Sequence, residues 1–316
     1  KSYSLNKRNC VHFINDVMQS VLSASYHVLQ AEFALSFTQI GLMSLAFMGT
    51  ASVLQPIVGM VTDRHPFPQS LTLGMGSTML GLFLLAWAPS YALLLTGAAL
   101  IGIGSAVFHP EASRVARAAA GRRFGTAQSL FQLGGNAGSS AGPLLAAFIV
   151  VPFGRGSVAW FAVMAMIGMT MLSQVGRWYA RQERARRKTV AAKHHGLPRR
   201  KVIVTIILLA FLVFTKNTYI ASISTYYTFF LIERFALSTQ EAQLMLFLFL
   251  GSAAAGVILG GLIGDRIGTR AVIWVSILGV LPFTLALPYV DLFWTGVLTV
   301  FIGVILSSAF PAIIVF

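Results

Sequence analysis

The chain has 316 residues, of which 56% are hydrophobic and 10% are charged, and its mean hydropathy is +0.78. Because soluble domains average about 25% charged residues, this composition argues against a soluble enzyme, a DNA-binding protein and a disordered chain. Long apolar runs recur from end to end, which is typical of a polytopic membrane protein. The single cysteine, Cys10, excludes an intramolecular disulfide and a cysteine metal cluster.

Apolar runs of about 20 residues are long enough to cross the hydrocarbon core, and on that basis the sequence predicts ten transmembrane helices. No short apolar leader with a small-residue cleavage site precedes the first helix, so we expect that helix to remain in place. Runs this long and non-alternating exclude a membrane barrel. The predicted spans are 10–31, 38–60, 70–89, 91–118, 124–151, 156–180, 202–231, 241–262, 271–290 and 293–316.

The net charge of +14 indicates membrane orientation rather than nucleic-acid binding. Of the 23 Lys and Arg residues, all but Arg155, Lys216 and Arg234 lie at the N-terminus or around the connections that follow even-numbered spans. Since Lys and Arg mark the cytoplasmic side, the N-terminus and the connection over 181–201 are predicted to be cytoplasmic. We interpret 181–201 as a solvated basic linker, and a lipid- or partner-binding patch is the alternative.

An internal repeat relates the two sides of this linker. The sequence FALS at 33–36 recurs at 235–238, and a Gly…Asp-Arg pattern at 59–64 recurs at 261–266, both at an offset of 202 residues. Six helices separate the copies, and because that number is even, both halves have the same orientation. Parallel repeats of this kind are typical of secondary transporters that work by alternating access.

The repeat predicts the domain organisation. We expect a six-helix bundle over 1–180, the basic linker over 181–201 and a four-helix bundle over 202–316. At the same offset residue 114 corresponds to residue 316, so we expect the partners of the fifth and sixth helices to follow Phe316.

Loop sequences carry a resemblance to a known family. GMVTDR at 59–64 and GLIGDRIG at 261–268 resemble the loop signature of the major facilitator superfamily, and both lie at the connections where that family carries it. The first copy departs after Arg64, where HPFP at 65–68 replaces the usual basic continuation. GGNAGSSAGP at 134–143, in the fifth helix, is similar to the Gly-Pro motif of drug–proton antiporters.

Further stretches resemble the bacterial fosmidomycin resistance proteins within that superfamily. They are HFIND at 12–16, VFHPEASRVAR at 107–117, FQLGGN at 131–136 and STYYTF at 224–229. The resemblance implies an all-α membrane protein with the twelve-helix major facilitator fold, of which ten helices lie in this chain. It also implies an exporter of an anionic phosphonate antibiotic, driven by inward proton flow.

The resemblance further implies a gate that latches the cytoplasmic side while the other side opens. Tight turns that favour Asp and Gly are the alternative interpretation, and the identical offset of the two loops favours the gate. The gating-loop residues are Gly59, Asp63 and Arg64 in the first half and Gly261, Asp265 and Arg266 in the second.

The first predicted helix carries a polar stripe that is too polar to face lipid. Asp16, its one acid, is a candidate for proton coupling, and an interfacial residue near the helix start is the alternative. His12 and Gln19 are candidates for substrate binding. The stripe consists of His12, Asp16, Gln19, Ser20, Ser23 and His27, which share one face of a helix.

The fourth predicted helix carries the sequence His109-Pro110-Glu111 and then Arg114. Glu111 and Arg114 are three residues apart, so they can pair on one face, and Pro110 can kink the helix. A charge inside a span costs about 2.5–3.5 kcal/mol on insertion scales and therefore suggests a function. Glu111 is our first candidate for the proton carrier, with Arg114 and His109 beside it, and a structural ion pair is the alternative.

The seventh predicted helix carries Lys216, the one basic residue near the middle of a span in the second half. Tyr219 and Tyr226 follow within about a third of the helix circumference. An ammonium group and hydroxyl donors suit a phosphonate or carboxylate, so these residues are candidates for substrate binding. In the fifth helix Asn136 is a further candidate, and an interhelical hydrogen bond worth about 0.6 kcal/mol is the alternative for it.

Motifs of zinc peptidases, serine hydrolases and nucleotide-binding loops are absent from the sequence, so we expect no enzyme and no cofactor or metal. The adjacent His194 and His195 are only a weak metal signal. The sequence therefore predicts a proton-coupled antiporter that exports a small anionic antibiotic, acting as a monomer in the bacterial inner membrane without a nucleic-acid partner. A proton-coupled symporter for a small organic anion is the alternative, and a non-transporting receptor or scaffold is a third hypothesis.

Overall fold

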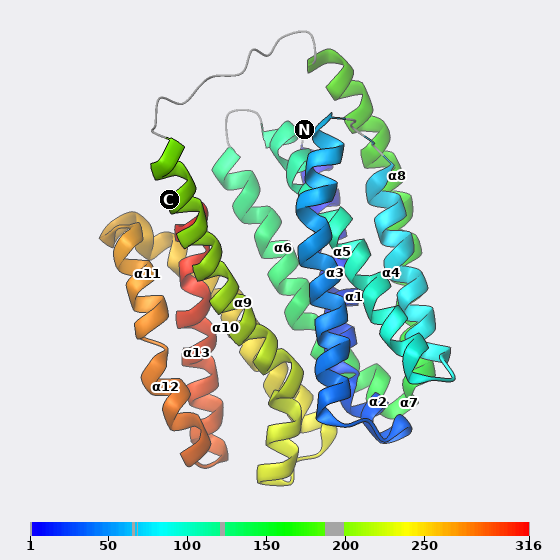
Figure 1. Ribbon diagram of the computed structural model, residues 1–316, viewed down its shortest axis with the longest axis vertical. Coiled ribbons are helices and arrows are strands. Elements are labelled where there is room, and N and C mark those ends of the chain that lie inside the picture. The colour runs from blue at the N-terminus through cyan, green and yellow to red at the C-terminus, as the bar shows by residue number, and fades with distance from the viewer. Residues whose placement is uncertain (1, 65–66, 68, 121–123, 187–198, 316) are drawn as a thin grey trace.

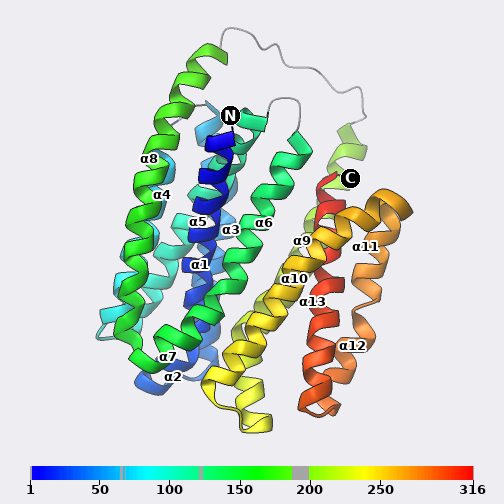
Figure 2. The same cartoon turned by 180° about the vertical axis from the view of Figure 1, so that it is seen from behind.

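The computed structural model describes residues 2–64, 67, 69–120, 124–186 and 199–315, and in these residues it is helical, without a strand. Figure 1 shows two groups of helices side by side, and Figure 2 shows them from behind. The first group contains α1 (Ser2–Ala24), α2 (Tyr26–Phe33), α3 (Phe37–Arg64), α4 (Ser70–Trp87), α5 (Tyr91–Ala120), α6 (Phe124–Leu145), α7 (Val151–Phe153) and α8 (Phe161–Arg186). The second contains α9 (Arg199–Phe235), α10 (Thr239–Ile267), α11 (Thr269–Leu278), α12 (Leu281–Ala286) and α13 (Leu292–Val315).

Within the described residues nine helical segments are long and apolar enough to cross a membrane, and each overlaps one predicted span. The predicted span 10–31 is not among them. The chain there forms two helices, α1 and α2, which meet at Ser25. The polar stripe also lowers the hydropathy of α1. This helix packs inside its bundle, against α5, α6 and α8, which agrees with the expectation that its polar stripe does not face lipid.

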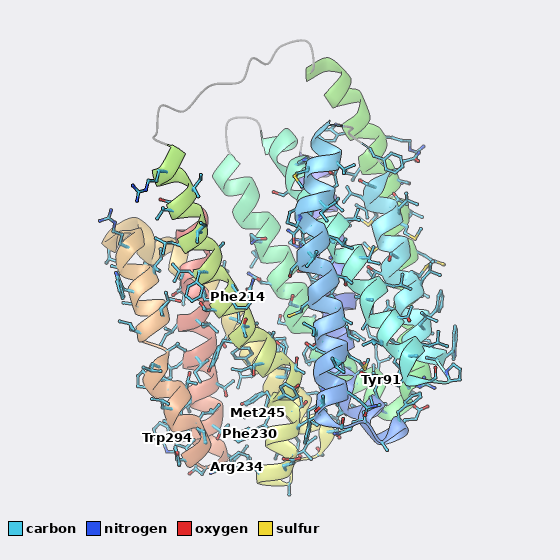
Figure 3. All side chains as sticks on the ribbon, viewed as in Figure 1. Tyr91, Phe214, Phe230, Arg234, Met245 and Trp294 are labelled. Atoms are coloured by element: carbon cyan, nitrogen blue, oxygen red, sulfur yellow. The ribbon has the colours of Figure 1, made fainter. Side chains whose placement is uncertain are left out.

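Each group of helices has an apolar core of its own. In the first group Met18 and Phe108 are fully buried in a core shared by the surrounding helices. In the second group Leu246 and Phe249 are fully buried in the core. Large apolar side chains also cover the outside, as the exposed Phe214 illustrates (Figure 3). An apolar exterior around an apolar core is the arrangement expected of helices that face lipid.

The internal repeat is visible in the backbone. Ala34 and Ala236 occupy equivalent positions after α2 and α9, and both adopt a left-handed conformation, with φ of 50° and 51°. In each copy a side chain at the start of the following helix then accepts a hydrogen bond from the backbone N–H three residues earlier. These pairs are Ser36 with Gln39 at 2.9 Å and Ser238 with Glu241 at 2.8 Å. The repeated sequence therefore specifies a repeated turn and helix start.

Candidate functional site

An ion pair within α5 connects this helix to the end of α3. Glu111 is 1% exposed, and its Oε1 lies 2.6 Å from Nη1 of Arg114. The same Nη1 donates a hydrogen bond to Oγ1 of Thr62 at 2.5 Å, and Nη2 donates to the carbonyl oxygen of Gly59 at 2.7 Å. The structure therefore brings two predicted proton-coupling residues into contact with the predicted gating sequence. Arg114 can hold all three groups at once because a guanidinium presents its donors in a planar fork.

The gating-loop prediction extends beyond the described side chains. Those of Asp63, Arg64 and Asp265 lie outside the described part of the structure, and of Gly261 only the backbone, which belongs to α10, is described. Arg266 is exposed in the last turn of the same helix. A gating role for these residues stays a prediction.

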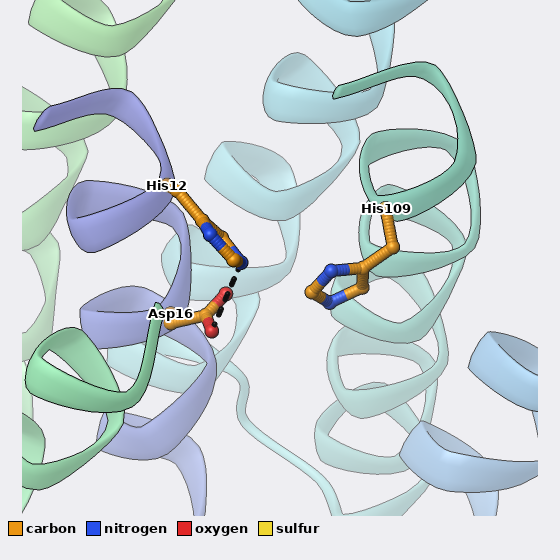
Figure 4. Close-up of side chains that lie close together, drawn as sticks. All are labelled: His12, Asp16 and His109. Atoms are coloured by element: carbon orange, nitrogen blue, oxygen red, sulfur yellow. Dashed lines mark ion pairs between the residues drawn. The ribbon is translucent and has the colours of Figure 1, made fainter. Parts of the chain in front are cut away.

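A second polar group lies between α1 and α5 (Figure 4). Nε2 of His12 is 3.4 Å from Oδ2 of Asp16, and the ring of His109 stands nearly perpendicular to that of His12, with 5.6 Å between their centroids. Nδ2 of Asn15 donates to the other carboxylate oxygen of Asp16 at 3.0 Å. Asp16 therefore faces His109, whereas Glu111 turns toward Arg114 and α3.

The glycine-rich face of α6 closes this group from the side. A Cβ atom on Gly135 would lie 2.5 Å from Cε1 of His12 and 2.7 Å from Oδ2 of Asp16, so any larger residue here would have to displace these two side chains. Gly138 and Gly142 lie similarly close to α1. The residues of the predicted antiporter motif therefore let α6 contact the polar stripe of α1 directly.

The remaining candidates of the first half lie farther along the same helices. Oε1 of Gln19 accepts a hydrogen bond from Oγ of Ser105 on α5 at 3.1 Å, while Asn136 is half-buried on α6. Ser105 and Thr62 were not predicted as site residues. Thr62 lies within the repeated loop pattern, which is a signal that could have identified it, whereas Ser105 has no comparable signal.

The candidates on α9 are not brought together. Lys216 is 7% exposed, and its Nζ has no hydrogen-bond partner in the part of the chain that the structure describes. The hydroxyl of Tyr219 instead pairs with Oγ1 of Thr284 at 2.7 Å, within the second half. Tyr226 reaches the first half, where its hydroxyl donates to the carbonyl oxygen of Phe37 at 3.3 Å.

Side-chain contacts join the two halves at the end of the bundles that lies opposite the N-terminus, around α2 (Figure 1). Nε2 of Gln243 on α10 donates to the carbonyl oxygen of Ala24 at 2.8 Å and lies 3.1 Å from Nδ1 of His27. Oγ of Ser44 and Oγ1 of Thr225 are 3.0 Å apart. Sequence reasoning missed this contact set, although Gln243, which follows Gln240 near the start of the otherwise apolar α10, was a signal for it.

Comparison with known proteins identifies the family. The sequence profile of the Major Facilitator Superfamily matches residues 9–316. The chain belongs to the Major Facilitator Superfamily. This result confirms the resemblance inferred from the loop sequences and the all-helical membrane fold, and it indicates a transporter rather than an enzyme.

Two curated superfamily members are similar over almost the whole chain. The fosmidomycin resistance protein of Escherichia coli (strain K12) is 55% identical over 306 residues, which cover 96% of this chain and 75% of that protein. An uncharacterized transporter of the superfamily from Bacillus subtilis (strain 168), YfnC, is 36% identical over 311 residues, which cover 96% of this chain and 76% of that protein.

Solved structures of other transporters have a similar fold. A bacterial homologue of the human lysosomal transporter Spinster, in an inward-facing and occupied conformation, superposes with a TM-score of 0.72 at 18% identity, covering 99% of this chain and 73% of that one. The nucleoside transporter NupG superposes with a TM-score of 0.70 at 14% identity, covering 99% of this chain and 80% of that one. At these identities the superpositions bear on the fold alone.

Proposed function

We propose that this member of the superfamily exports a small anionic antibiotic such as fosmidomycin in exchange for protons. The observation that carries the proposal is the 55% identity with a fosmidomycin resistance protein along 96% of the chain. Alternating access would come from rocking of the bundle over 1–180 against the bundle over 202–316. The protein would act as a monomer in the bacterial inner membrane, with its N-terminus and the linker over 181–201 in the cytoplasm.

The charge of Lys216 supports an anionic substrate. The Nζ atom of Lys216 is buried and has no hydrogen-bond partner among the described residues, and a charged group inside a membrane protein is costly and suggests a function. An incoming phosphonate would supply a negative charge and accept hydrogen bonds from Nζ. Tyr226, Asn136, His12 and Gln19 are the further candidates for contacts with the substrate.

The contacts of Arg114 support coupling between proton binding and the gate. Protonation of Glu111 would remove the negative charge that holds Arg114 on one side. The hydrogen bonds from Arg114 to Gly59 and Thr62 would then be free to rearrange. Glu111 would be the main proton carrier, with Asp16 and His109 as a second group that accepts protons on the same side of the bundle.

The end at which the two halves touch also suits this proposal. In the proposed orientation the contacts of Gln243 and of Ser44 lie on the outer side of the membrane. A carrier joined on that side is poised to receive its substrate from the cytoplasm, which an exporter requires.

The test is proton movement in liposomes that contain the purified full-length protein and a pH-sensitive dye. Fosmidomycin is added under an imposed proton gradient. Proton movement opposite to the drug is the expected result and would establish antiport. Movement in the same direction would make the protein a symporter, and no response to any anionic phosphonate would contradict the proposed substrate class.

The matching variant is Glu111→Gln, which keeps the shape of the side chain but removes its charge. We expect it to abolish drug-dependent proton movement while downhill exchange of the drug continues. Glu233→Gln, at an exposed position near the end of α9, is the control and should behave like the unaltered protein. Uphill transport at the normal rate by Glu111→Gln would remove Glu111 from the coupling mechanism.

A further inference from the structure

We propose that His12, Asp16 and His109 form a binding site for a divalent first-row transition-metal ion such as Zn²⁺ or Co²⁺. The proposal goes beyond the antibiotic–proton exchange and does not rest on it. One ligand atom from each of the three residues lies within 4.8 Å of the other two. His12 is only 2% exposed, so the site lies inside the first bundle rather than on its surface (Figure 4).

The spacing of His12 and Asp16 matches two ligands of one metal ion, and His109 offers a third ligand atom within 4.8 Å of both. His12 and Asp16 are four residues apart and therefore project from the same face of α1, and α5 supplies His109 from the opposite side. Zn²⁺ binds at about 2.1 Å, so neighbouring ligands of a tetrahedral ion are about 3.4 Å apart. The distance between Nε2 of His12 and Oδ2 of Asp16 is 3.4 Å. That distance is longer than the roughly 2.7–3.2 Å of ordinary N–H···O hydrogen bonds.

The chemistry of the three ligands is also suitable. Two imidazole nitrogens and one carboxylate oxygen are ligands that Zn²⁺ and Co²⁺ accept, whereas Mg²⁺ and Ca²⁺ prefer oxygen alone. The single carboxylate partly neutralises a divalent ion inside the bundle. Three protein ligands leave a fourth position for water or for an oxygen of an anionic molecule.

The surroundings hold the ligands in place. Nδ2 of Asn15 donates to Oδ1 of Asp16, which leaves Oδ2 directed toward His12, and such outer contacts commonly orient metal ligands. Gly135 leaves no side chain in the space beside His12 and Asp16. Glu111 and Arg114 are bound to each other, so Arg114 has a counter-charge of its own close by.

The experiment measures metal binding by the full-length protein in detergent, without transport. Co²⁺ is the first probe because its visible absorption reports tetrahedral coordination, and Zn²⁺ is then titrated against a chromophoric chelator at fixed pH. His194 and His195 are replaced by Ala in every protein, so that this adjacent pair does not contribute. We expect one bound ion per chain, with the absorption of a tetrahedral site that includes nitrogen ligands.

Three variants connect the signal to the site. His109→Ala and Asp16→Asn should each weaken binding by about tenfold or more, since each removes a ligand. His27→Ala removes another buried histidine of the first half that lies outside the group, and it should bind as the parent protein does. Asp16→Asn preserves the shape of the side chain, so it keeps the test valid if an alanine variant does not fold.

Two results would overturn the proposal. One is a parent protein that binds neither Co²⁺ nor Zn²⁺, and the other is normal affinity in both His109→Ala and Asp16→Asn. Because binding is measured apart from transport, a protein that exports fosmidomycin but binds no metal contradicts this inference alone. A protein that binds metal but does not move the drug contradicts only the proposed transport.

Discussion

Replacement of Gly138 by Ala should force α1 and α6 apart. A Cβ atom at this position would meet the carbonyl oxygen of Phe13, and it would lie 3.0 Å from the carbonyl carbon and 3.1 Å from Cα of the same residue. All three atoms belong to the backbone of α1, so no side-chain rotation can make room. The two helices must therefore move apart, which also loosens the contacts of α6 with His12 and Asp16.

The size of the effect follows from two opposing contributions. Overpacking a well-packed contact costs about 1–3 kcal/mol, whereas exchange of Gly for Ala within a helix gains about 0.5–1 kcal/mol. We therefore expect Gly138→Ala to lose about 1–2 kcal/mol. At about 2–4 °C per kcal/mol for a chain of this order of size, Tm should fall by about 2–8 °C.

The matched control is Gly49→Ala in α3. A Cβ atom at Gly49 would meet nothing within 4 Å, so only the favourable helix contribution remains and Tm should stay the same or rise. The assay is thermal unfolding of both purified variants in one detergent, alongside the parent protein. A Gly138→Ala variant that melts at or above the temperature of Gly49→Ala would refute the close-packing argument for α6.

Three further predictions concern single side chains. Lys216→Ala should weaken binding of an anionic phosphonate by about tenfold or more, and equilibrium titration showing unchanged affinity would leave Lys216 a structural role. Arg114→Lys keeps the charge, but a lysine cannot bind Glu111 and the end of α3 at the same time. The initial rate of drug transport should therefore fall severely. A rate equal to that of the parent protein would contradict a role for these Arg114 contacts in transport. Gln243→Leu removes the contacts with Ala24 and His27, which are worth about 0.5–1.5 kcal/mol each. The distances between spin labels on α2 and α10 should therefore lengthen. An unchanged distance distribution would show that these contacts do not hold the two halves together.

Several features could be predicted from the sequence because they depend on local spacing. The repeated turn needs only a few residues around Ala34 and Ala236, and the structure shows the same conformation in both. The pairing of Glu111 with Arg114 follows from a separation of three residues on one helix and is present at 2.6 Å. Hydropathy alone was sufficient to locate nine of the spans among the described residues.

Contacts between helices could not be predicted in the same way. Tyr219 and Tyr226 lie on the same side of α9, yet they have partners in different halves of the protein. Tyr219 bonds to Thr284 in the second half, and Tyr226 bonds to Phe37 in the first. The direction in which a helix face points depends on how the bundles dock, which hydrophobic periodicity does not encode. The same limit explains why Gln243 was missed.

The structure also refines the register of the repeat. A Cβ atom on Gly102 would meet Oγ1 of Thr50 where α5 crosses α3, and one on Gly303 would meet Oγ of Ser252 where α13 crosses α10. Thr50 and Ser252 are 202 residues apart, as in the rest of the repeat, but the two glycines are 201 apart. The final helix of the chain is therefore shifted by one residue relative to its counterpart, and the helix crossing itself is retained.

In that register the two halves share their packing but not their charges. At the offset of 201 residues the counterpart of Glu111 is Ala312, so α13 has no acid at this position. A carboxylate is therefore not needed for packing of this pair of helices. Conversely, the counterpart of Lys216 at an offset of 202 is Ile14, which is buried in the apolar core of the first half. At these corresponding positions the first bundle carries the acid, and the second carries a buried cation whose Nζ has no hydrogen-bond partner among the described residues. Such a division favours a mechanism in which one bundle binds the proton and the other the anion, since rocking of the two bundles then acts on both ligands together.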